Sequence, residues 1–242
     1  MLYIALFITG ALSWFISTVA AGGAATLLIP IIGFLLGAQY VAPIISLAAI
    51  CSNPARAWLF REHVDWKVIA YLMPGSLVGA FFGAWSFSFL DPKWIQVVLA
   101  FFLISYVFQY KFGKSELSFK VKKIWFFPLG GLISFLSGLV GATGPILNPF
   151  MLNYGLKKEQ LVGTKSINSL AMQLTKLTTY TLFGVISLEV VQYGILLGLG
   201  AVVGVFIARK HLFNIAHERF QFYTMIMMLV AGVLMLAKLF IN

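Results

Sequence analysis

The chain contains few of the side chains that catalysis and metal binding require. Its 242 residues include one cysteine, Cys51, three histidines and seven acidic residues. A single cysteine forms no disulfide within the chain and supplies no zinc cluster. We therefore expect no enzyme, no catalytic group, no metal and no cofactor. The alternative from another class is a membrane-embedded enzyme or assembly factor that uses Cys51, and it has few groups to work with.

Charged residues are also scarce, at 10% of the chain against 61% hydrophobic residues. A water-soluble domain of this size needs far more charge on its surface. Most of the 17 Lys and Arg residues are scattered through short loops, which argues against nucleic acid as a partner. We expect one all-α integral membrane domain over residues 1–242, because most apolar runs approach the roughly 20 residues of a spanning helix. These runs are Leu2 to Leu36, Val41 to Phe60, Val68 to Leu90, Trp94 to Tyr110, Ile124 to Leu152, Leu161 to Leu182, Val190 to Ala208 and Phe220 to Ile241.

Two glycine-rich breaks interrupt apolar runs that would otherwise read as long helices. The first contains Gly22 and Gly23, and the second contains Gly141 and Thr143, with Asn148 shortly after it. Backbone groups freed at such a break must be buried in protein or line a wet cavity, and the following helix points its positive end there. Paired breaks in corresponding halves indicate the substrate site of a transporter. The first run is not expected to be a cleaved signal peptide, because no positive charge precedes it and its pattern recurs internally.

The two halves of the chain repeat one another. We therefore expect a duplicated unit, with repeat 1 at residues 1–110, a basic linker at 111–123 and repeat 2 at 124–242. Matched positions lie 119 to 121 residues apart and include Gly22 with Gly141, Pro30 with Pro149, Asn53 with Gln173, Arg56 with Lys176, Gly79 with Gly200 and Gly83 with Gly204.

The basic loops indicate the topology. The linker at 111–123 carries five lysines, so the positive-inside rule places it in the cytoplasm. If each break lies in a re-entrant hairpin followed by three spans, every clearly basic loop is cytoplasmic, whereas four full spans put Lys157 and Lys158 outside. One helix over Leu2 to Leu36 would also be about 52 Å long, against a hydrocarbon core of about 30 Å. We expect inverted repeats in the cytoplasmic (inner) membrane with both termini outside; a long tilted helix with a glycine kink is the alternative.

Polar side chains inside the spans are the candidate ligand groups. Asn53 and Arg56 share one helix face, and Lys165, Gln173 and Lys176 belong to a polar stripe on the matching helix. Snorkelling toward the cytoplasm is the alternative for Arg56 and Lys165, and a bond between helices is the alternative for Asn53. Lys176 lies deeper in its span and is the stronger candidate for a functional cation.

Every acidic residue lies in or beside a loop, so the expected interior offers donors and cations without carboxylates. Such a site suits a small anion. No intramembrane Asp, Glu or His is expected to bind a coupling ion. The membrane potential, which contributes about 2.3 kcal/mol per charge per 100 mV, can therefore drive export. Coupling to a sodium ion bound by backbone carbonyl groups at the breaks is the alternative. The candidate substrate-binding residues are Asn53, Arg56, Gln173, Lys176, Asn168, Gly22, Gly23, Gly141, Thr143 and Asn148.

The combined pattern resembles the sulfite exporter TauE/SafE family of bacterial and archaeal membrane proteins. The resemblance is carried by the N-terminal glycine break with Pro30, the helix with Asn53 and Arg56, the turn from Arg61 to Trp66 and the glycine stripe, all in a repeated unit. It implies export of sulfite, sulfoacetate or a similar sulfonate. An importer or channel for a small inorganic or organic anion on the same scaffold is the alternative, and a homodimer stays open. The second half departs from the pattern, with Ala142 and Thr143 at its break.

Overall fold

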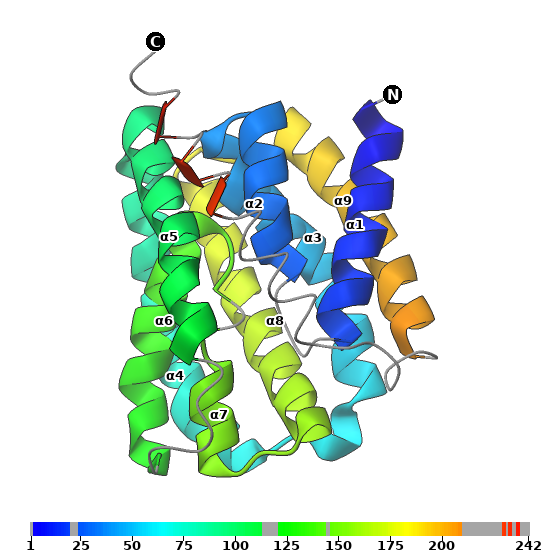
Figure 1. Cartoon of the computed structure of the whole chain (residues 1–242), viewed down its shortest axis with the longest axis vertical. Helices are drawn as coiled ribbons and strands as arrows, with labels where there is room; N and C mark the ends of the chain where they lie inside the picture. The colour runs from blue at the N-terminus through cyan, green and yellow to red at the C-terminus, as the bar shows by residue number, and fades with distance from the viewer. Residues whose placement is uncertain are drawn as a thin grey trace.

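The computed structural model describes residues 2–19, 24–112, 121–143 and 146–209, with 229, 230, 232, 233, 236 and 237 near the C-terminus. All regular structure within these residues is helical (Figure 1), which confirms the predicted all-α class. The predicted run from Phe220 to Ile241 lies largely outside the described residues, as do Gly22 and Gly23. The helices are α1 (Leu2–Val19), α2 (Ala24–Leu35), α3 (Ala38–Leu59), α4 (Trp66–Phe89), α5 (Pro92–Phe112), α6 (Phe126–Val140), α7 (Asn148–Tyr154), α8 (Lys158–Leu182) and α9 (Leu188–Arg209), with 3-10 turns η1 (Arg61–His63) before α4 and η2 (Lys123–Trp125) before α6.

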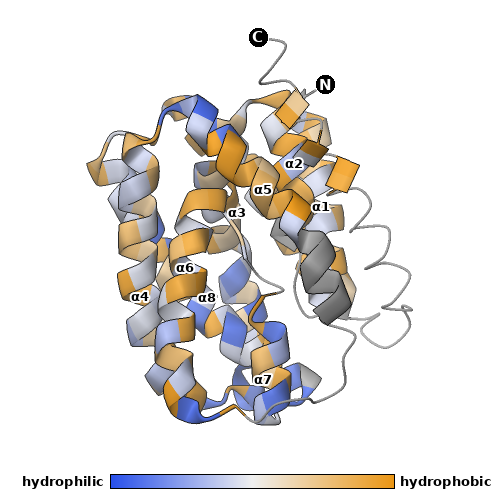
Figure 2. Ribbon diagram, turned by 60° about the vertical axis from the view of Figure 1, so that its left-hand side comes forward, coloured by the Kyte–Doolittle hydropathy of each residue, from blue (hydrophilic) through white to orange (hydrophobic). Residues whose placement is uncertain are grey.

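The outer surface of the bundle is apolar. Figure 2 shows hydrophobic residues along the outward faces of α4, α5 and α6, where Phe101 is 61% and Leu132 66% exposed. By length and composition, three segments of the described chain can cross a membrane, namely Trp66–Phe89, Lys123–Val140 and Leu188–Ala208. Exposed apolar area on this scale is unfavourable in water. The exterior therefore fits a lipid bilayer.

Glycines bring two pairs of helices into backbone contact, and both pairs join the two halves of the chain. On α4, a Cβ atom added to Gly79 would lie 2.0 Å from the carbonyl oxygen of Gly131 on α6. On α9, a Cβ atom added to Gly200 would lie 2.0 Å from the carbonyl oxygen of Phe7 on α1. No side chain fits at either position, so the predicted close-packing stripe is confirmed. The glycine helix of each half thus packs on the first helix of the other half.

Helices α1 and α2 form a hairpin whose open end lies near the start of α9. The ring of Tyr3, at the start of α1, lies 6.0 Å from the ring of Tyr193 on α9. Tyr40 follows α2 closely, and its hydroxyl donates a hydrogen bond of 3.0 Å to Glu189, one turn before Tyr193. The start of α1 and the end of α2 therefore lie at one end of the bundle, and Figure 1 shows the other ends of both helices deep in the molecule.

Helices α6 and α7 form a second hairpin that opens at the opposite end. The rings of Phe126, at the start of α6, and Tyr154, at the end of α7, lie 5.4 Å apart. This end also holds the starts of α4 and α8, because the backbone N–H of Asp65 donates to the hydroxyl of Thr164 at 2.9 Å. The ends of α4 and α8 meet at the other end, where the rings of Phe89 and Phe183 lie 5.5 Å apart. The two hairpins therefore enter the bundle from opposite ends (Figure 1).

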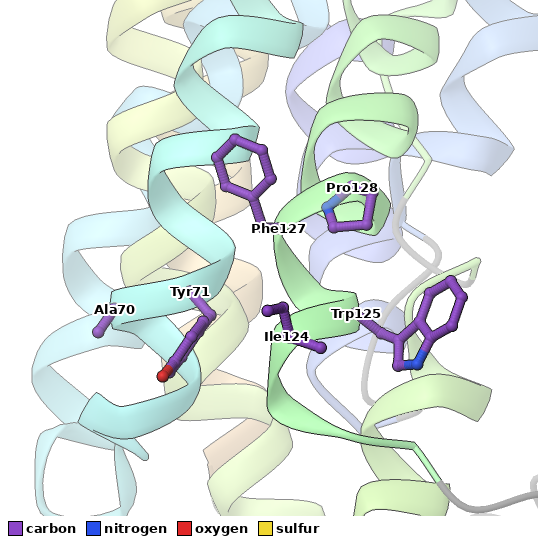
Figure 3. Close-up of a pocket in the computed structure, with 6 residues that line it drawn as sticks. All are labelled: Ala70, Tyr71, Ile124, Trp125, Phe127 and Pro128. Atoms are coloured by element: carbon purple, nitrogen blue, oxygen red, sulfur yellow. The ribbon is translucent and has the colours of Figure 1, made fainter.

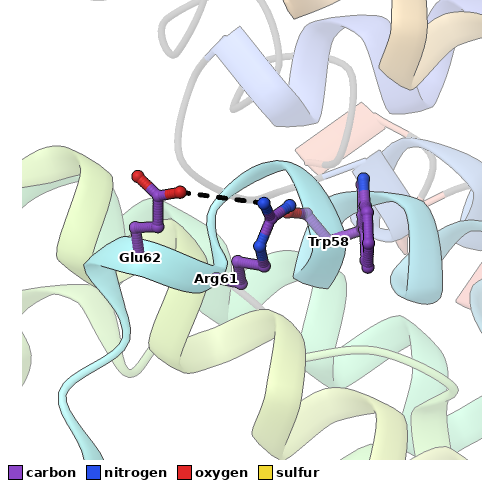
Figure 4. Close-up of polar contacts among 3 residues, drawn as sticks. All are labelled: Trp58, Arg61 and Glu62. Carbon is purple, nitrogen blue, oxygen red and sulfur yellow. Dashed lines mark hydrogen bonds and ion pairs between the residues drawn. The ribbon is translucent and has the colours of Figure 1, made fainter.

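Basic residues gather at the end where the second hairpin opens. Exposed cations at this end are Arg61, Lys67, Lys122, Lys123 and Lys157. Arg61 lies 4.3 Å from the ring centre of Trp58 and 3.7 Å from Glu62 (Figure 4). The opposite end exposes Asp91, Lys93 and Glu189, so one end is clearly basic among the residues that the structure describes.

Candidate functional site

Helices α3 and α8 lie side by side, and both carry buried polar groups at matched positions. On α8, Lys176 is fully buried, and its ammonium donates to the carbonyl of Gly141 at 3.0 Å and to the hydroxyl of Ser137 at 3.3 Å. One turn later, the hydroxyl of Tyr180 donates to the carbonyl of Gly138. These oxygens lie at the C-terminal end of α6, which lacks intrahelical donors and carries the negative end of the helix dipole. Lys176 therefore neutralises the end of α6 at the second break.

The break at Gly141 depends on glycine. Its φ angle is +93°, in a region that L side chains rarely adopt, and an added Cβ atom would lie 3.0 Å from the Cα atom of Ala42 on α3. The second break therefore approaches α3 as well as α8. The sequence predicted a break here, and the structure shows that its carbonyl group faces a cation.

Arg56 repeats the arrangement in the first half. One Nη atom of its guanidinium group lies 3.5 Å from the hydroxyl of Ser17, near the end of α1, and the side chain is half-buried. Ser17 and Ser137 are 120 residues apart, as are Arg56 and Lys176. In each half, a cation from the helix after the hairpin thus contacts a serine near the end of the hairpin's first helix. Among the described residues, the buried Nε atom of Arg56 has no hydrogen-bond partner.

A direct hydrogen bond joins α3 to α8 between the two cations. The amide of Asn53 donates to the hydroxyl of Ser169 at 2.8 Å, so the bond between helices anticipated as an alternative for Asn53 is present. Gln173 follows Ser169 by one turn and is 4% exposed, and its Oε1 atom has no partner among the described residues. The interface of α3 with α8 is therefore polar, and one of its buried hydrogen-bond acceptors has no partner among the described residues.

Two candidate residues hold other parts of the bundle together. Asn168 donates to the hydroxyl of Ser76 on α4 at 3.1 Å, and its own Oδ1 atom has no partner among the described residues. Thr143 donates to the carbonyl of Ile133 on α6 at 3.1 Å, which ties the second break to its own hairpin. Both side chains therefore serve helix packing in this structure.

The structure adds Lys165 to this group of residues. It is half-buried, donates to the side-chain oxygen of Asn148 at the start of α7, and lies close enough to Arg56 for their charges to interact. Its sequence position, near the cytoplasmic end of its span, allowed a snorkelling interpretation and kept it out of the candidate set. The sequence had nevertheless placed Lys165 on the polar stripe with Gln173 and Lys176.

These groups are cations and hydrogen-bond donors rather than carboxylates. The buried polar and charged side chains of the described residues include no Asp or Glu. No group of three or more His, Cys, Asp and Glu residues that could hold a metal ion occurs in the part of the chain that the structure describes. Cations, amides and hydroxyls without carboxylates stabilise a negative ligand.

An apolar groove lies away from this centre, on the outer face between α4 and α6 (Figure 3). It has a volume of about 430 Å³ and is lined by Ala70, Tyr71, Ile124, Trp125, Phe127 and Pro128. None of the candidate anion ligands lines it, so the groove is separate from the polar centre.

Comparison with known protein families gives one match. A family model described as sulfite exporter TauE/SafE matches residues 6–235, which is nearly the whole chain. Searches of curated proteins and of solved structures find no match. The matched region contains both hairpins, the crossed glycine contacts and the two cations with their serines. The chain therefore belongs to the sulfite exporter TauE/SafE family of membrane transporters.

Proposed function

We propose that this protein is a secondary transporter that exports a small sulfur oxyanion or organosulfur anion, such as sulfite, sulfoacetate or a similar sulfonate, across the cytoplasmic membrane. The matched pairs Arg56 with Ser17 and Lys176 with Ser137 are the observation that carries the proposal. They present cations and hydroxyl donors from both halves, without a buried carboxylate among the described residues. The family match supports the substrate class.

The proposed architecture is a pair of inverted repeats, each a re-entrant hairpin followed by three spans. Helix α2 has 12 residues, about 18 Å, and α7 has seven residues, about 10 Å, so neither crosses a core of about 30 Å. The hairpins that open at opposite ends and the crossed glycine contacts support the inverted relation. The basic end of the described bundle supports a cytoplasmic location for that end and, with it, the proposed outside location of the termini.

In the proposed mechanism, the anion is held near mid-membrane between the two breaks. Arg56 makes the first contact, because its Nε atom is a donor with no partner among the described residues. Lys176 contributes next by exchanging the carbonyl of Gly141 for an oxygen of the anion. That exchange loosens the attachment of the second hairpin to α8. Binding at Lys176 is thereby coupled to movement of the hairpin, as alternating access requires.

The proposed driving force is the membrane potential. An inside-negative potential favours the exit of a monovalent anion by about 2.3 kcal/mol per 100 mV, and a dianion by about twice that. In a proton or sodium symporter, an intramembrane acidic residue or histidine usually binds the coupling ion. None appears among the buried side chains described here, so we propose export without a coupled cation.

Ligand-induced stabilisation tests this function. The melting temperature of the purified protein is measured with sulfite, sulfate, thiosulfate, sulfoacetate, taurine and simple carboxylates, because a ligand of the native state alone raises stability. Selective stabilisation by sulfite or a sulfonate is expected. Stabilisation by carboxylates alone, or by none of these compounds, contradicts the proposal. Flux under imposed gradients of either direction separates an exporter from an importer or channel.

A further inference from the structure

The outer groove between α4 and α6 has the apolar lining of a site for a hydrocarbon chain. All six of its lining residues are exposed, and five of them are apolar or largely apolar side chains larger than alanine. In Figure 3, Tyr71 of α4 and Ile124 of η2 lie on facing elements, Phe127 lies between α4 and α6, and Trp125 extends from η2 on the side away from Tyr71. Trp and Tyr are the side chains that settle at the boundary between hydrocarbon and head groups.

Three lysines flank this groove. Lys67 precedes Tyr71 by one helical turn and so shares its face of α4. Lys122 and Lys123 directly precede Ile124, and all three lysines are exposed. The one ion pair among the described residues joins Arg61 to Glu62, so the flanking ammonium groups have no carboxylate partner there. The nearest acidic side chain in sequence, Asp65, accepts hydrogen bonds from the backbone N–H groups at the start of α4.

We propose that this groove binds an anionic phospholipid, with one acyl chain along the apolar lining and the phosphate at Lys67, Lys122 and Lys123. Basic pockets between helices on the cytoplasmic side bind acidic lipid head groups. Within the described residues the opposite end offers no equivalent, because its exposed aromatics lie beside Asp91 and Glu189, and Lys93 is the one exposed cation described there. Charge complementarity therefore selects an acidic lipid at this end. The proposal requires only a bilayer and is independent of the transported anion.

The bound lipid also supports the seam between α4 and α6. Phe127 lines the groove, and its carbonyl oxygen would lie 2.0 Å from a Cβ atom added to Gly75 on α4. A chain that packs on Phe127 therefore packs beside one of the close backbone contacts between the two helices. Because the end of α6 carries the Ser137 hydroxyl and the Gly141 carbonyl that accept from Lys176, the lipid stabilises the element that carries the second break.

Quenching of Trp125 by brominated lipids tests the site. The full-length protein is reconstituted in phosphatidylcholine nanodiscs with increasing brominated phosphatidylglycerol or brominated phosphatidylcholine. The signal of Trp125 is taken as the difference between wild type and Trp125→Phe. We expect brominated phosphatidylglycerol to quench Trp125 at a lower mole fraction than brominated phosphatidylcholine does. In Lys122→Gln/Lys123→Gln, the preference for phosphatidylglycerol should be about tenfold weaker. Lys93→Gln, at the opposite end, is the matched control and keeps the preference.

Two results overturn the proposal. Equal quenching of Trp125 by the two brominated lipids in wild type means that ordinary bilayer lipid covers the groove. Absence of quenching by either lipid, in a protein that is dimeric, means that a second copy covers it. Trp58, which stacks with Arg61 at the same end, provides the reference for a tryptophan outside the groove through Trp58→Phe. Native mass spectrometry of wild type and the double lysine variant checks the lipid preference without the tryptophan substitution.

Discussion

Arg56 and Lys176 occupy matched positions in the two halves, yet their surroundings differ. Lys176 is fully buried and donates to two oxygens of α6, whereas Arg56 is half-buried, touches one serine and keeps an unpartnered Nε atom. In this structure Arg56 therefore has a donor available for a ligand, whereas the donors of Lys176 hold the second hairpin. The difference gives the two substitutions different expected outcomes.

Substitution of Arg56 is expected to weaken anion binding. Arg56→Met removes the charge and all donors, and because charge-assisted hydrogen bonds contribute about 1.5–3 kcal/mol, binding falls by about tenfold or more. Arg56→Lys keeps the charge without the forked donors and gives an intermediate affinity. Isothermal titration with sulfite measures both, with Lys93→Met as the exposed control. Wild-type affinity in Arg56→Met would remove this residue from the site.

Substitution of Lys176 is expected to reduce stability as well as binding. Lys176→Met leaves the carbonyl of Gly141 and the hydroxyl of Ser137 without their donor, and an unsatisfied buried group costs about 1–3 kcal/mol. The melting temperature in detergent should therefore fall in the absence of ligand, which is not expected for Arg56→Met. An unchanged melting temperature with normal anion binding would show that Lys176 neither holds the second hairpin nor binds substrate.

At the scale of helices, the crossed glycine contacts join the halves. Gly79 and Gly131 face each other in the α4–α6 pair. A Cβ atom on Gly79 would clash with backbone at 2.0 Å, whereas one on Gly131 would lie 3.6 Å from the carbonyl oxygen of Gly75, an ordinary contact distance. The two glycines therefore form a matched test and control. In the α1–α9 pair, Gly200 of α9 is the counterpart of Gly79.

We expect Gly79→Ala and Gly200→Ala to destabilise the protein, each by about 1–3 kcal/mol, because backbone must move to admit the methyl group. Gly131→Ala should be neutral or slightly stabilising, since alanine favours helix by up to about 1 kcal/mol over glycine. Thermal unfolding of the three variants in one detergent measures the differences. Equal stability of Gly79→Ala and Gly131→Ala would contradict the close contact of α4 with α6.

The sequence predicted those features of the fold that require a particular residue type, such as glycine, at a particular position. Glycines at spacings of four predicted the close contact of α4, and a glycine cluster that interrupts an apolar run predicted the break at Gly141, where the structure shows a positive φ angle. Partners of side chains were not predictable, because the bond from Lys176 to Gly141 or from Asn168 to Ser76 depends on how distant segments pack. The match of Ser17 with Ser137 was present in the sequence at the spacing of 120 and was missed, since serine is common in such helices.

At the scale of the whole molecule, the distribution of charge predicts its orientation. The basic end, which includes Lys123 and Lys157, is expected in the cytoplasm, and Lys93 outside. In a Cys51→Ala background, a membrane-impermeant maleimide should label Lys93→Cys in intact cells and label Lys157→Cys only after the membrane is opened. Labelling of both from outside would contradict the proposed topology of the second half.

The most direct test of the central claim is voltage-driven sulfite flux through the purified protein in proteoliposomes. A potassium diffusion potential is imposed with valinomycin, without a sodium or proton gradient, and sulfite efflux is followed for wild type, Arg56→Met and the control Lys93→Met. The account predicts efflux that rises with an inside-negative potential, falls at least about tenfold in Arg56→Met and is unchanged in Lys93→Met. Sulfite flux that ignores the potential, or that survives unchanged in Arg56→Met, would contradict it.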